Sequence, residues 1–91
     1  HDPVAGHLLS VALTESGRWA EARAVREELL ARDGGEAWQP WYWLVELRAR
    51  TGDTLGARAA ADSARVRAAD PDARRLIDSL VVSLTGPIGP L

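Results

Sequence analysis

Apolar residues recur along the chain with the three- to four-residue spacing of amphipathic helices. Such stretches cover residues 3–16, 19–32, 39–51, 54–69 and 71–85, with charged residues on the opposite faces. No segment competes as a strand, because β-branched residues are few and no hairpin turn joins two alternating runs. The pattern therefore predicts an all-α fold of helices at about these ranges.

The turn residues between these stretches repeat with a regular period. Glycines that each follow a serine or threonine are spaced by 35 and then 34 residues, at Gly17, Gly52 and Gly86. An aspartate–proline pair, which favours a helix start, occurs at residues 2–3 and again at residues 70–71. Short loops between paired helices require antiparallel hairpins. The spacing therefore predicts two helix-turn-helix repeats followed by a single final helix.

Several of these positions match a known repeat pattern. Segments 17–22 and 52–57 place a glycine, a bulky residue and a small alanine across the turn into the second helix, and Trp41 precedes Leu44 by three residues. With Ala64 and the pair at 70–71, these features resemble the tetratricopeptide repeat (TPR) family over residues 3–86. Arg26 and Ala61 depart from it, since they stand where the family prefers a large aromatic residue.

The resemblance implies a right-handed α-solenoid that forms one domain over residues 1–86. Because Pro87 directly follows Gly86, residues 87–91 cannot continue the last helix and are expected to form an extended tail. In such arrays the first helix of each repeat lines a groove that binds extended peptides. The chain has no lysine or asparagine for a carboxylate-binding groove of the kind that some family members use.

Composition narrows the function classes. Charged residues make up 26% of the chain and the net charge is −2, which disfavours nucleic acid as a partner. No apolar run approaches the ~18–20 residues that span a bilayer, so we expect a soluble protein. All 11 basic residues are arginine, which suggests a bacterial source, and the chain begins at His1 rather than methionine. We therefore expect a segment of a longer protein or a processed form, in the bacterial cytoplasm or secreted after processing.

Residues for catalysis or metal binding are few. The two histidines, His1 and His7, do not share one helical face, and there is no cysteine. No serine, histidine and acid occur in a recognisable catalytic order. The adjacent carboxylates Glu27 and Glu28 are best explained as a solvated helix face. We therefore expect no catalytic activity, no metal and no cofactor.

Aromatic residues form the strongest candidate for a binding surface, with four of them between residues 38 and 43. They either pack in the core or form an exposed anchor for a partner, because aromatic side chains dominate interface hot spots. Together with the groove positions that the TPR resemblance implies, they give a predicted partner-binding set of Trp38, Tyr42, Glu46, Arg50, His7, Leu76 and Leu80.

The sequence is consistent with three functions. The first is a non-catalytic interaction or scaffold module that binds a peptide or partner protein through the repeat groove. The second is a structural subunit that associates head to tail with other copies of itself, through an apolar last helix and tail, with Ile88, Leu91, Val82 and Leu84 as candidate contacts. The third is an accessory repeat domain of a larger bacterial enzyme or regulator.

Overall fold

The computed structural model describes residues 3–85, and this part of the chain contains helices and no strand. The helices are α1 (Pro3–Glu15), α2 (Trp19–Asp33), α3 (Trp38–Arg50), α4 (Thr54–Arg67) and α5 (Pro71–Thr85). The all-α prediction is confirmed, and the observed ends differ from the predicted ones by at most two residues. The tail expected at 87–91, with Ile88 and Leu91, lies outside the described residues.

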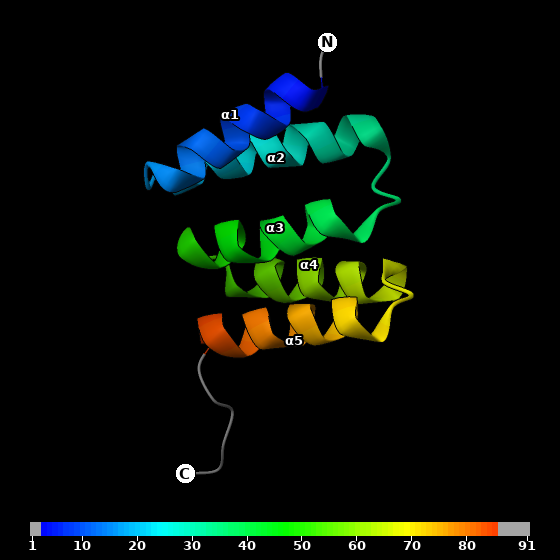
Figure 1. The fold of residues 1–91 in the computed structure, drawn as a ribbon. Helices are drawn as coiled ribbons and strands as arrows, with labels where there is room; N and C mark the ends of the chain where they lie inside the picture. The colour runs from blue at the N-terminus through cyan, green and yellow to red at the C-terminus, as the bar shows by residue number, and fades with distance from the viewer. Residues whose placement is uncertain (1–2, 86–91) are drawn as a thin grey trace.

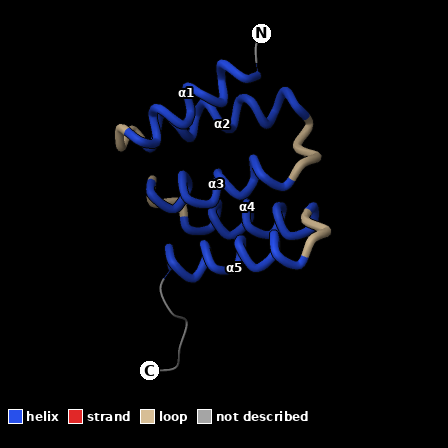
Figure 2. The backbone as a smooth tube through the Cα atoms, in the orientation of Figure 1, coloured by secondary structure: helices blue, strands red, loops and turns tan. Residues whose placement is uncertain are grey.

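The helices form antiparallel hairpins that stack on one another (Figure 1). Helices α1 and α2 pair, α3 and α4 pair more extensively, and α5 packs against both α3 and α4. The short loops connect neighbouring helices at alternating ends of the stack (Figure 2). The smallest dimension of the molecule is 19 Å, about the thickness of two helix layers. Within the described residues, no helix is both long and apolar enough to cross a membrane.

Two consecutive glycines make the turn between the hairpins. Gly34 ends α2 with a φ of 83°, and its N–H donates to the Leu30 carbonyl, while Gly35 has a φ of 67°. A Cβ at Gly35 would lie 3.0 Å from the Trp41 ring, whose Nε1 donates to the Gly35 carbonyl over 2.9 Å. The turn therefore needs glycine both for its left-handed backbone and for this close ring contact.

Polar side chains connect the first hairpin to the second. Asp53 caps α4 by accepting from the Gly56 N–H over 2.7 Å, and its carboxylate also binds Arg23 of α2 over 2.9 Å. The Gly56 N–H, and after it Arg23, lower the pKa of Asp53. From α3, Arg48 binds Glu27 of α2 over 3.0 Å. The orientation of the first hairpin on the second thus depends partly on charged groups.

The main core lies among α3, α4 and α5. Leu44 and Val45 of α3 and Ile77 of α5 are fully buried there against an alanine stripe on α4. This stripe consists of Ala57, Ala60, Ala61 and Ala64. Small side chains on α4 let the neighbouring helices approach closely, which gives the alanine-rich sequence a structural role. A separate, smaller cluster of Leu13, Ala22 and Leu47 holds the first hairpin.

Candidate functional site

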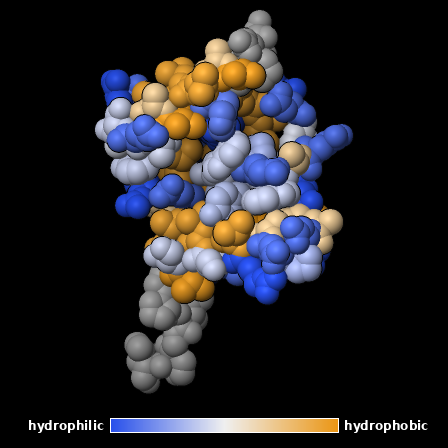
Figure 3. All heavy atoms as spheres, viewed as in Figure 1, coloured by the Kyte–Doolittle hydropathy of each residue, from blue (hydrophilic) through white to orange (hydrophobic). Residues whose placement is uncertain are grey.

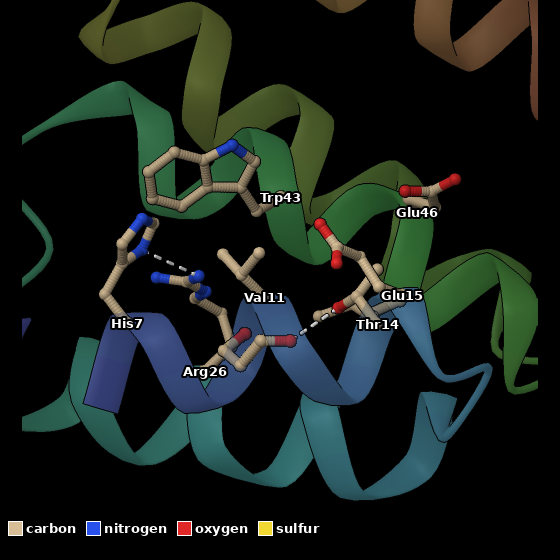
Figure 4. A pocket seen from close by; sticks show the side chains of 9 residues that line it. His7, Val11, Thr14, Glu15, Arg26, Trp43 and Glu46 are labelled. Atoms are coloured by element: carbon tan, nitrogen blue, oxygen red, sulfur yellow. Dashed lines mark hydrogen bonds between the residues drawn. The ribbon is translucent and has the colours of Figure 1, made fainter. Parts of the chain in front are cut away.

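A pocket of about 320 Å³ lies where the first hairpin meets α3 (Figure 4). Helix α1 contributes most of its wall, α2 contributes Arg26, and α3 closes it with Trp43. Apart from these two, the lining residues are His7, Ser10, Val11, Thr14, Glu15, Glu46 and Leu47. The pocket thus lies between α1 and α2 of the first hairpin and α3 of the second.

The guanidinium of Arg26 is buried at the base of this pocket, with only 4% of the residue exposed. Its Nη2 lies 3.1 Å from His7 Nδ1, and its central carbon lies 4.3 Å from the centroid of the Trp43 ring. Because a guanidinium can only donate, Nδ1 of His7 is the acceptor in this contact. The Trp43 and His7 rings are themselves 4.8 Å apart, so the three side chains form one stacked cluster.

The charge of Arg26 has no direct counter-ion in the part of the chain that the structure describes. No carboxylate of residues 3–85 lies within 4 Å of it, and its buried Nε has no hydrogen-bond partner. Desolvation by burial lowers the pKa of Arg26. A buried cation that is stabilised only by a histidine and an aromatic face is costly, because its lost hydration is incompletely replaced.

Carboxylates lie at the other end of the pocket. Figure 4 shows Arg26 between His7 and Val11 beneath Trp43, with Glu15 and Glu46 on the far side of Val11. Glu15 is exposed, and Glu46 forms an ion pair of 3.5 Å with Arg50. The pocket is therefore positive at one end and negative at the other, with apolar atoms between.

The corresponding junction of the second hairpin with α5 is mainly apolar. Shifting the pocket residues by the repeat period of 35 and 34 residues gives, for seven of the nine, positions that belong to the main core or pack against it; Val11 and Glu15 instead correspond to Glu46 and Arg50. In this register, His7, Ser10, Arg26 and Trp43 correspond to Tyr42, Val45, Ala61 and Ile77. A pocket of about 320 Å³ lies at each junction, but the buried position that holds Arg26 in the first holds Ala61 in the second.

The predicted binding residues do not form one site. His7 and Glu46 line the pocket, and Arg50 stacks on Trp19 at 5.0 Å while it binds Glu46. Trp38 and Tyr42 contact each other edge to face at 5.7 Å and are half-buried against the main core.

The other candidate residues lie on α5. Leu80 and Leu84 pack against the main core, while Leu76 and Val82 are exposed. None of these four lines the pocket at α1, α2 and α3.

Sequence reasoning missed Arg26 and Trp43 as site residues. A signal for Arg26 was present, because it lies four residues after Ala22 and three before Leu29 and therefore on the buried stripe of α2. A charged residue on a buried stripe is a departure from the core pattern, and such departures concentrate at functional sites.

The fold and the pocket define an all-helical, helical repeat-like protein with a charged pocket beside its first hairpin. Within residues 3–85, no group of three or more histidine, aspartate or glutamate side chains could hold a metal ion. The chain matches no protein-family model, no curated protein and no solved structure.

Proposed function

We propose that this chain is a non-catalytic interaction module, a TPR-like right-handed helical repeat that binds an extended peptide segment of a partner protein. The periodic glycine turns and the stacked hairpins support the repeat assignment. The observation that carries the binding role is the pocket at the junction of the two hairpins, where His7, Arg26 and Trp43 form a stacked cluster around a buried guanidinium.

Trp43 is the expected anchor for the partner. It is 37% exposed, it closes the pocket, and its ring is held in place by Arg26 and His7. A rigid, partly exposed aromatic side chain loses little conformational entropy on binding and gains contact area, which is why such residues form interface hot spots. Peptides that bind this module should therefore contact Trp43.

We expect Trp43→Ala to weaken peptide binding by about tenfold or more, the effect of losing an aromatic hot spot. Peptides selected from a random displayed library on the full chain provide the ligands, and titration calorimetry measures their affinity for each variant. Leu55→Ala is the matched control, because Leu55 is exposed on α4 and does not line the pocket. Circular dichroism establishes that both variants stay helical. Selected peptides that bind Trp43→Ala as tightly as the parent chain, or the absence of any selected peptide, would contradict the proposal.

A second candidate function is head-to-tail self-assembly, and the exposed apolar residues of the two end helices favour it. On α1, Leu8 is 60% exposed and Leu9 is also exposed, and Figure 3 shows hydrophobic residues gathered over this helix. On α5, at the other end of the stack, Leu76 and Val82 are exposed. Contact between an α1 face and an α5 face of another copy would bury both and would propagate into rings or filaments.

If the ends associate, the parent chain should form oligomers whose mass rises with concentration in light scattering. Leu8→Glu blocks the α1 face and Val82→Glu blocks the α5 face, so each variant alone should be a monomer. A mixture of the two should still form a heterodimer through the intact faces, because this contact joins different surfaces. A parent chain that remains monomeric at all concentrations excludes this function and leaves the interaction module.

A further inference from the structure

The pocket contains a buried cation whose hydrogen bonds are incomplete. Arg26 donates to His7, but its Nε is buried without a partner, and no carboxylate of residues 3–85 forms an ion pair with it. At the matching position of the second hairpin the fold has Ala61, which is fully buried. The architecture of the repeat thus does not require a cation here, and the arginine carries an unmet demand for a hydrogen-bond acceptor.

A carboxylate meets this demand best. The planar fork of a guanidinium matches the two oxygens of a carboxylate. Charge-assisted hydrogen bonds of this kind are stronger than hydrogen bonds between neutral groups. Burial against Trp43 strengthens the hydrogen bonds of a bound carboxylate, because less water competes for Arg26. A single acidic side chain that enters the pocket would therefore supply the hydrogen-bond acceptor and the counter-ion that the buried arginine lacks.

The far end of the pocket selects a different charge. Glu15 forms no ion pair with any described residue, and Glu46 is bound only at 3.5 Å by Arg50. These carboxylates disfavour a strongly acidic peptide and favour a lysine or arginine side chain beside the acidic one. Side chains two positions apart in an extended peptide point to the same face, so one peptide can place an acid at Arg26 and a base at the two glutamates.

We propose that the pocket binds an acidic and a basic side chain of an extended peptide, two positions apart, with the acidic group on Arg26 and the basic group at Glu15 and Glu46. This assignment rests on the proposed function and adds the chemical class of the partner segment. It involves groups on all three helices around the pocket, so it depends on the packing of the first hairpin against α3.

Short capped peptides test the assignment on the unmodified full chain. Nuclear magnetic resonance follows the indole N–H of Trp43 during titration with Ac-Glu-Ala-Lys-NH2, for which we expect a Kd on the order of 1 mM, as suits so small a ligand. Replacing its glutamate with glutamine should weaken binding by about tenfold or more, because a buried charge-assisted bond is lost. Replacing its lysine with glutamine should cost about two- to fivefold, the size of an exposed ion pair.

Protein variants separate a binding role of Arg26 from a structural one. Arg26→Met fills similar space without the buried charge, so its melting temperature should be equal to or higher than that of the parent, while peptide binding is lost. A lowered melting temperature with unchanged peptide affinity would show that Arg26 only holds the helices together, and would overturn the assignment. The Glu15→Gln, Glu46→Gln double variant should lose its preference for the lysine peptide over its glutamine analogue.

The outcomes distinguish this inference from the proposed function. Equal binding of the glutamate and glutamine peptides at Trp43, with library peptides still bound, would refute the charge assignment and keep the interaction module. Tighter binding of a phosphoserine analogue than of the glutamate peptide would replace the carboxylate with a phosphate ligand and overturn the assignment as stated. If neither capped nor library peptides perturb Trp43, both proposals fail.

Discussion

Replacing Ile77 with alanine is expected to lower the free energy of unfolding by about 2–5 kcal/mol, the cost of deleting a buried branched side chain and leaving a cavity. Ile77 is 0% exposed and is the largest fully buried side chain of α5 in the core that α3, α4 and α5 share. Its neighbours on α4 are alanines, whose short side chains cannot move into the space. The loss therefore falls in the upper part of this range.

Urea denaturation followed by circular dichroism measures this effect, and the melting temperature should fall by about 4–8 °C per kcal/mol in a domain of this size. Leu76→Ala is the matched control, since Leu76 is adjacent on α5 but 52% exposed. Its effect should be well below that of Ile77→Ala. Equal effects of the two substitutions would mean that α5 is packed on a different face from the one described.

The second large effect concerns Ala61, which occupies the same repeat position as Arg26. Placing arginine there should destabilise the chain by about 3–5 kcal/mol, comparable to leaving an uncompensated charge in a core. At the first hairpin the guanidinium has a cavity, the His7 ring and the face of Trp43. At the second hairpin, Ala61 is fully buried among apolar side chains and does not line the neighbouring pocket, so a longer side chain at this position causes strain.

Thermal unfolding of Ala61→Arg should be compared with that of Ala59→Arg, because Ala59 is exposed on the same helix. The exposed substitution should change the melting temperature little, while the buried one should lower it strongly or prevent folding. A small effect at both positions would show that the second junction accommodates a buried arginine as the first one does. The first junction would then not be special in tolerating a buried arginine.

The sequence predicted the helices well because their signals are local. Apolar spacing and glycine turns act within a few residues of each helix end, and Asp53 directly before α4 caps it with its side chain. The predicted end of α4 at residue 69 was two residues late, since α4 ends at Arg67 and Ala68 is already extended. Asp70 precedes Pro71, which begins α5. A residue before proline is disfavoured in the helical conformation, so α4 ends before this residue.

The site could be predicted only in part. His7 and Glu46 were expected at the groove and do line the pocket, but Trp38 and Tyr42 pack against the main core. Helical periodicity places Trp38 and Tyr42 on one face without showing which neighbour covers that face. Trp43, which lies about 100° around the helix from Tyr42, is the aromatic residue that closes the pocket.

The sequence by itself determined the all-helical fold, the approximate helix ends and the alternation of short turns, because these depend on spacing and on the backbone preferences of glycine and proline. The charge of Arg26 indicated a solvent-facing position for this residue, which the structure buries on the stripe of Ala22 and Leu29. Only the tertiary structure decided that this arginine meets His7 and Trp43 in a pocket, whereas its counterpart Ala61 is sealed in a core. Residues 7, 26 and 43 belong to three helices, and the distance of Trp43 from the other two follows from how the first hairpin packs on α3, a result of many side chains together.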